Sequence, residues 1–73
     1  MQTRIPVFCS SGNIRFAGMD HYGVRVLDTR GRQVAAETDV CRRFILPQMP
    51  GGVYVVVVSG TGFQPESFKM LLP

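Results

Sequence analysis

The sequence predicts an all-β protein, a small antiparallel β-sandwich of about six or seven short strands. Apolar side chains recur at every second position in most segments, which is the spacing of a strand with one buried face. β-branched residues are concentrated in the segment Val53–Val58. Turn signals rich in Gly, Pro, Asp and Ser separate the segments at intervals of roughly eight to twelve residues. No segment has the spacing of an amphipathic helix.

Length and composition indicate one domain that spans residues 1–73. A chain of 73 residues, 45% of them hydrophobic, can fold but buries only about 60% of the surface that its unfolded form exposes. This size excludes a two-domain enzyme with a cleft between its domains. The longest apolar run, Val53–Val58, is far shorter than the roughly 18 residues of a membrane span, so we expect no membrane insertion.

Two segments in the first half of the chain alternate apolar and polar residues, Asn13–Ala17 and Tyr22–Asp28. Side chains at alternate positions of a strand point to the same face of the sheet. The side chains that we expect in the core are therefore those of Ile14, Phe16, Tyr22, Val24 and Val26.

A β-hairpin is predicted at Asp28–Gly31. The Asp28 carboxylate can accept hydrogen bonds from nearby backbone amides, and Gly31 can adopt the positive φ that a tight turn needs. The segment Arg32–Glu37 then returns as the partner strand.

The second half of the chain predicts three more strands. Over Val40–Leu46 either side could face the core, because both sides carry an Arg, and the Pro- and Gly-rich segment Pro47–Gly52 ends this strand. Val53–Val58 is apolar on both faces, which predicts a central strand covered on both sides, or covered on one side with a partner on the other. Ser59–Gly62 turns the chain into a last strand, Glu66–Leu72. This number and spacing of strands indicate a sandwich of immunoglobulin-like type.

The net charge is +3, from seven Arg and one Lys against five acidic residues. Arg binds phosphate through its planar guanidinium, so nucleic acid is one candidate partner. A small β-barrel that binds nucleic acid needs exposed aromatic and basic side chains on one face. Here Phe16 and Tyr22 alternate with Arg15 and Arg25, which directs rings and charges to opposite faces. We therefore expect solvated strand faces and no nucleic-acid partner.

The cysteines Cys9 and Cys41 and the single histidine, His21, are too few for a structural zinc site. No local signature supports nucleophilic catalysis by Cys, His and Asp. We therefore expect no enzymatic activity and no cofactor. Two states of the cysteines stay open. One is a Cys9–Cys41 disulfide, which suits an oxidising compartment and requires Cα atoms within about 7 Å; the other is two buried free thiols.

Several short motifs follow one another through the chain. The strand Val24–Asp28 is followed by Gly31, Arg32 and Val34; then come Leu46–Pro50, Gly52-Val53-Tyr54 at the start of an apolar strand, and Lys69 before Met70, Leu71 and Leu72. This order and spacing, from Asn13 to Leu72, resemble the C-terminal sorting domain of cargo proteins of the type IX secretion system, also called the Por secretion system.

The resemblance implies a non-catalytic, immunoglobulin-like domain at the C-terminus of a larger secreted protein. Such a domain directs its folded parent from the periplasm across the outer membrane to the cell surface. Its partners would be the outer-membrane translocon, a shuttle protein and a sortase. The motif positions that the resemblance implies are Asp28, Gly31, Arg32, Gly52, Val53, Tyr54, Lys69, Met70, Leu71 and Leu72. Of these, we expect Lys69 and the last strand to be read by a receptor, through charge and edge pairing.

Two departures from the family suggest a domain that is retained uncleaved. Family members commonly end on a basic residue, and many open with Tyr-Pro-Asn-Pro, whereas this sequence ends Leu71-Leu72-Pro73 and has Ile5–Cys9 at the opening position. The alternative function is a generic immunoglobulin-like interaction or spacer module of an extracellular protein. An apolar strand in a small sandwich also permits a strand-exchanged dimer.

Overall fold

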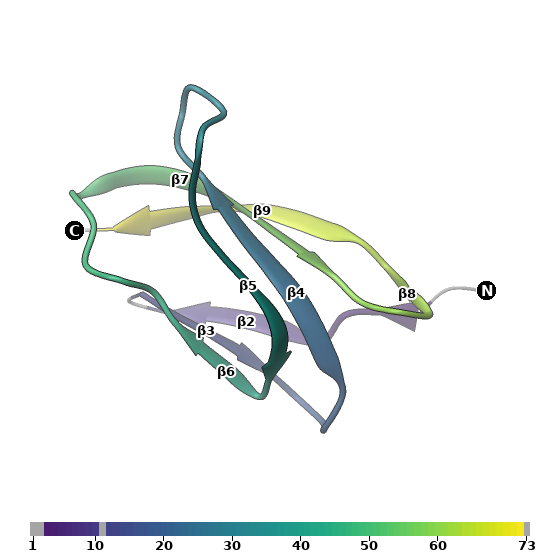
Figure 1. Cartoon of the computed structure of the whole chain (residues 1–73). Helices are drawn as coiled ribbons and strands as arrows, with labels where there is room; N and C mark the ends of the chain where they lie inside the picture. Colours follow the sequence, from purple (N-terminus) through teal and green to yellow (C-terminus); the bar gives the residue numbers. More distant parts are fainter. Residues whose placement is uncertain (1–2, 11, 73) are drawn as a thin grey trace.

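The structure, a computed structural model, describes residues 3–10 and 12–72, which form an all-β fold with two antiparallel sheets (Figure 1). One sheet has the strand order β2–β3–β6, with β2 at Val7–Ser10, β3 at Asn13–Phe16 and β6 at Arg43–Ile45. The other has the order β5–β4–β7–β9, with β5 at Gln33–Cys41, β4 at His21–Leu27, β7 at Gly52–Ser59 and β9 at Glu66–Leu72.

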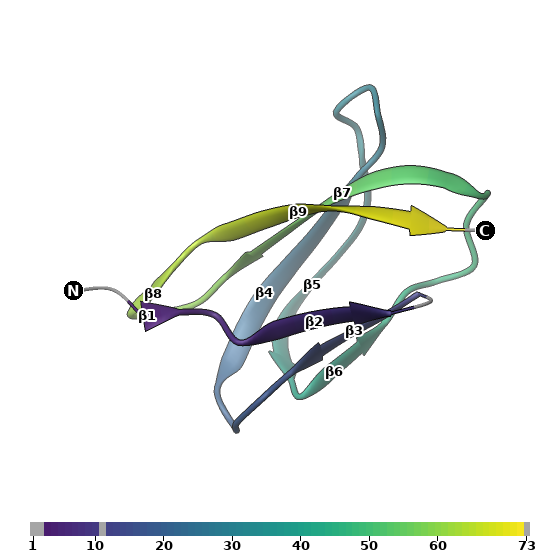
Figure 2. The ribbon, with the colours of Figure 1, turned by 180° about the vertical axis from the view of Figure 1, so that it is seen from behind.

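A short parallel pair was not predicted. It joins β1, Thr3–Arg4, to β8, Phe63–Gln64, and lies at the end of the molecule opposite the last residues of β9 (Figure 2). With this pair the described residues contain nine strands, more than the six or seven expected, because the chain also pairs in segments only two residues long. These residues contain no helix that is long and apolar enough to cross a membrane.

Both sheets contribute to one core, and the predicted alternation is confirmed in β3 and β4. In each strand every second side chain is buried, as expected for a strand with one face on the core. The buried side chains common to prediction and structure are Ile14, Phe16, Tyr22, Val24 and Val26. They pack with Val40, Tyr54, Val56, Val58 and Met70 from the other strands of the larger sheet.

Tyr22 connects the two sheets through its ring. The ring stacks on Phe16 of the smaller sheet, with centroids 4.5 Å apart, and meets Phe63 edge-on at 5.3 Å. Gly60 allows this approach, because a Cβ atom there would lie 2.9 Å from Tyr22 Cδ1. The turn before β8 is therefore held against the core by an aromatic cluster.

The predicted hairpin between β4 and β5 is confirmed, but β5 continues beyond Glu37 to Cys41. Where a break was expected, the strand contains a β-bulge. The register moves from Val24 opposite Glu37 to Tyr22 opposite Val40, and Asp39 takes a positive φ of 62°. The bulge accommodates one extra residue, and the two strands stay paired on both sides of it.

The prediction of one continuous strand over Val40–Leu46 was wrong. Cys41 pairs with His21 in the larger sheet, whereas Arg43 pairs with Arg15 in the smaller one. Between them Arg42 has a φ of 70°, and its carbonyl accepts a hydrogen bond of 2.7 Å from the Phe16 amide.

The chain therefore crosses from the larger sheet to the smaller one at Arg42. This crossing determines which side of the segment Val40–Leu46 faces the core. Val40 and Leu46 are buried and Phe44 packs against the core. In a straight strand Arg42 would lie on the same side as Val40 and Phe44 and would be buried, but the crossing places it at the surface. Among the described residues no carboxylate pairs with the Arg42 guanidinium, and its exposure avoids the cost of burying an uncompensated charge.

The central position predicted for Val53–Val58 is confirmed, since β7 lies between β4 and β9. Its two faces differ, however. Tyr54, Val56 and Val58 are buried, whereas Val53 on the other face is exposed. In the described residues the core covers one face of this strand and neighbouring strands cover its two edges.

Two isoleucines of the smaller sheet should differ sharply in their effect on stability. Ile14 has no exposed surface, and Ile45 is 62% exposed. We expect Ile14→Ala to lower the free energy of unfolding by about 2–5 kcal/mol, a large part of the stability of a domain this small. Ile45→Ala should lower it by less than about 0.5 kcal/mol. Urea unfolding of both variants tests this contrast, and equal losses would contradict the assignment of the core.

Candidate recognition site

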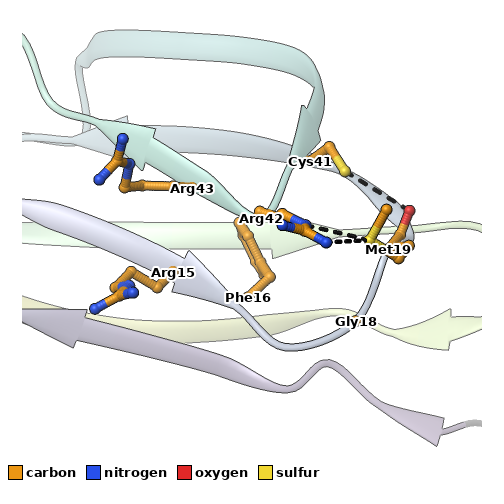
Figure 3. A pocket seen from close by; sticks show the side chains of 7 residues that line it. All are labelled: Arg15, Phe16, Gly18, Met19, Cys41, Arg42 and Arg43. Carbon is orange, nitrogen blue, oxygen red and sulfur yellow. Dashed lines mark hydrogen bonds between the residues drawn. The ribbon is translucent and has the colours of Figure 1, made fainter.

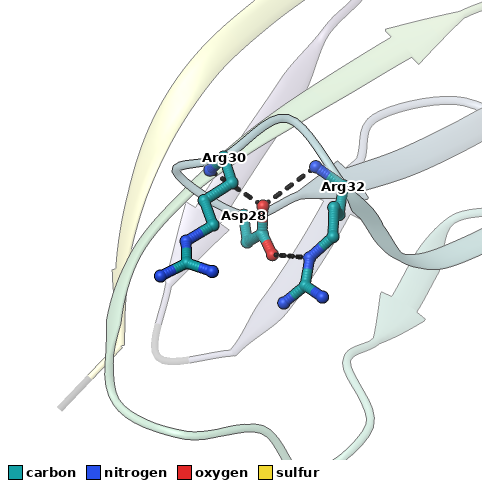
Figure 4. A network of polar contacts seen from close by, with 3 residues as sticks. All are labelled: Asp28, Arg30 and Arg32. Carbon is teal, nitrogen blue, oxygen red and sulfur yellow. Dashed lines mark hydrogen bonds and ion pairs between the residues drawn. The ribbon is translucent and has the colours of Figure 1, made fainter.

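The Asp28 turn is organised by a single carboxylate (Figure 4). Asp28 Oδ1 accepts hydrogen bonds of 2.9 Å from the backbone amides of Arg30 and Arg32, and Oδ2 accepts one of 3.1 Å from Arg32 Nε. Gly31 has a φ of 84°, in the region that a residue with a Cβ atom rarely adopts. Three predicted motif residues, Asp28, Gly31 and Arg32, thus form one turn.

These contacts lower the pKa of the Asp28 carboxyl. The largest cause is the hydrogen bond from the Arg32 backbone, and the Arg32 side chain and the Arg30 amide act in the same direction. Hydrogen bonds to the charged form favour that form. Asp28 and the backbone of Arg32 therefore stabilise the turn, while the Arg32 guanidinium is mostly exposed.

The Gly52-Val53-Tyr54 motif begins β7. Gly52 has a φ of 147°, which favours glycine at the entry to the strand. Tyr54 is buried, and its hydroxyl donates a hydrogen bond of 2.6 Å to the Pro50 carbonyl. This bond gives the polar tip of a buried ring its partner and ties the Pro-rich loop to the strand.

The terminal motif lies on β9, an edge strand of the larger sheet. Met70 is buried in the core and Leu72 is half-buried, whereas Lys69 is exposed and Leu71 is 74% exposed. In the described residues β9 pairs with β7 alone, so its second edge has no strand beside it. An open edge presents backbone groups that can pair with a further strand.

The sheet register brings the second and third motifs together. Gly52 pairs with Leu72, Val53 with Leu71 and Tyr54 with Met70. The pairs alternate in direction: Tyr54 and Met70 point into the core, whereas Val53 and Leu71 form an exposed apolar pair.

The Asp28 turn lies toward the same end of the sheet. Leu27, the residue before the turn, pairs with Val55, whose partner on the other side is Lys69. The structure therefore gathers all three predicted motifs around one end of the four-stranded sheet. Its outer surface there, formed by Val53, Lys69 and Leu71, is termed the terminal face.

The cysteines are free thiols in the structure. Cys9 is exposed, and Cys41 is half-buried with its thiol 3.7 Å from the Met19 carbonyl oxygen. Neither the disulfide nor the burial of both thiols is therefore seen. His21 lies 3.6 Å from Asp39, and both side chains are mostly exposed. In the described part of the chain no three His, Cys, Asp or Glu side chains gather where they could hold a metal ion.

Sequence reasoning missed a cluster of arginines. Arg15, Arg42 and Arg43 line one cavity of about 710 Å³ beside Met19 (Figure 3). The doublet Arg42-Arg43 was a signal for it. Its proximity to Arg15 depends on the crossing between the sheets, which the sequence pattern did not indicate.

Comparison of this chain with protein-family models, curated proteins and solved structures finds no match.

The Asp28 turn should make the stability of the domain depend on pH. Because the pKa of Asp28 is lower in the folded protein, the charged carboxylate stabilises the fold above the ordinary pKa of 3.8 that the group has in the unfolded chain. This stabilisation is lost as the pH falls through the folded pKa. Asp28→Asn should therefore melt below the wild type at about pH 6, and the difference should shrink toward about pH 2. A difference in melting temperature that does not change with pH would contradict the role of the charge.

Proposed function

We propose that this chain is an immunoglobulin-like β-sandwich that acts as a non-catalytic sorting domain of the type IX secretion system. It directs a folded parent protein from the periplasm across the outer membrane to the cell surface, where it stays attached to its parent. The partners in this proposal are the outer-membrane translocon, the shuttle protein and the sortase.

One observation carries the proposal: two motifs about fifteen residues apart in the sequence are direct neighbours in the sheet. Val53 of the Gly52-Val53-Tyr54 motif lies opposite Leu71 of the terminal motif. Both are exposed, although apolar side chains of this size are usually buried. An exposed apolar pair beside an open strand edge is a surface that a receptor can use for side-chain contacts and for strand addition.

The motif residues then divide into two groups. Asp28 and Tyr54 make internal hydrogen bonds, and Gly31 and Gly52 take a positive φ, so these four residues shape the turn, the strand entry and the loop. Val53, Lys69 and Leu71 present their side chains on the terminal face. Recognition is assigned to this second group, and the first group holds it in place.

A reporter fusion tests the proposal. The domain is attached to the C-terminus of a periplasmically targeted fluorescent protein in a host with an intact type IX system. We expect the reporter at the cell surface. The double substitution Lys69→Ser, Leu71→Ser should retain most of it in the periplasm. Substitution is preferred to truncation, because removal of β9 would also remove Met70 from the core.

The matched control is Val34→Ser, Glu37→Ser. These residues are also exposed, and they lie on β5, the opposite edge of the same sheet. The control should be exported like the parent fusion, and circular dichroism should show that both variants fold. A parent fusion that stays in the periplasm would contradict the sorting function and favour the alternative of an interaction or spacer module. Equal export of both variants would contradict recognition through the terminal face.

A further inference from the structure

The outer face of the three-stranded sheet joins positive charge to exposed apolar surface. Phe8, Arg15 and Arg43 form one row across β2, β3 and β6, because Phe8 pairs with Arg15 and Arg15 pairs with Arg43. All three side chains are exposed, Phe8 at 63%. Ile45, which is 62% exposed, lies two residues along β6 and therefore on the same face. The term "basic face" denotes these four residues.

The two arginines oppose each other at a cost to the fold. Like charges directly across neighbouring strands destabilise a sheet. In the part of the chain that the structure describes, neither Arg15 nor Arg43 has an ion-pair partner. Of the described residues, no Asp or Glu lines the adjoining cavity. An anion bound between the two guanidinium groups would remove this repulsion.

A third arginine stands at the other end of the same cavity (Figure 3). The Arg42 guanidinium points to Met19, with Nη2 2.8 Å and Nε 3.2 Å from the thioether sulfur. A thioether is a weak, uncharged acceptor, so this contact leaves the positive charge uncompensated. Three positive charges therefore line this cavity, and their combined field attracts anions.

We propose that the basic face binds the phosphate headgroups of an anionic lipid surface. The guanidinium groups of Arg15 and Arg43 match phosphate oxygens in geometry and charge. Phe8 and Ile45 are placed to enter the apolar boundary below the headgroups, while the strands stay outside the bilayer. This proposal uses residues remote from the terminal face and does not depend on the sorting function.

The apolar side chains favour lipid over nucleic acid as the phosphate source. Single-stranded nucleic acid binds to platforms of several aromatic rings. Among the Phe and Tyr side chains that the structure describes, Phe8 is the one that is exposed, and the single histidine, His21, lies on β4 of the other sheet. Ile45 cannot stack on a base, but it adds apolar area at a membrane interface.

Vesicle sedimentation with the whole 73-residue chain tests the proposal. The probes are vesicles of phosphatidylcholine alone and of phosphatidylcholine mixed with phosphatidylglycerol. We expect binding to the mixed vesicles and little to the neutral ones. Arg15→Gln, Arg43→Gln should weaken binding roughly tenfold or more. The control Arg25→Gln, Arg30→Gln removes the same charge from exposed positions of β4 and its hairpin, and should weaken binding about threefold or less.

A second measurement, the melting temperature, distinguishes the loss of the binding site from the loss of folding. Removal of the opposed charges should leave the melting temperature of Arg15→Gln, Arg43→Gln equal to or above that of the wild type. Equal loss of vesicle binding in both double variants would overturn the proposal in favour of net charge alone. Binding of inorganic phosphate or single-stranded DNA without binding to mixed vesicles would overturn it in favour of those ligands.

Discussion

The chain passes from the larger sheet to the smaller one at Arg42, and the shared core and the basic face both depend on this crossing. β5 and β6 are separated by one residue but belong to different sheets, so the crossing closes the core along one side. Arg42 carries it with a φ of 70°, a conformation that costs free energy for a residue with a side chain. A hydrogen bond from Phe16 and the burial of Val40 and Leu46 on either side offset that cost.

The packing of the core determines which side chains point outward. Tyr54 and Met70 must point inward to fill it, and their neighbours Val53 and Leu71 are therefore forced to the surface. In the smaller sheet the burial of Ile14 directs Arg15 outward in the same way. Exposed apolar and charged groups thus gather on two separate faces, the terminal face and the basic face.

The β4–β5 hairpin could be predicted because its signals are local: an Asp that accepts backbone hydrogen bonds and a Gly that takes a positive φ within the same turn. The split of Val40–Leu46 could not, since the segment contains neither Gly nor Pro and the break falls on Arg42. The alternation of apolar and polar residues in β3 and β4 correctly predicted which of their side chains are buried. Burial in these two strands follows from the residue pattern within each strand alone.

The register between strands that are distant in the sequence could not be predicted from the residue pattern. Both the terminal face and the basic face depend on this register. Part of the terminal face could be predicted, since the resemblance identified Val53 and Leu71 as motif positions. Their pairing across β7 and β9 could not be predicted. The basic face was missed because alternation was judged within single segments. Phe8 and Arg15 meet only when β2 is set against β3, and Arg43 joins them only after the crossing at Arg42.

The pairing around Arg42 can be measured directly by interstrand nuclear Overhauser effects in the isotopically labelled chain. The fold described here predicts backbone contacts between Tyr22 and Val40 and between Arg15 and Arg43 in the same spectrum. If the segment instead continued straight along β4, Arg43 would lie opposite Met19. Contacts between Arg43 and Met19 without contacts to Arg15 would contradict the crossing, and with it the placement of the basic face.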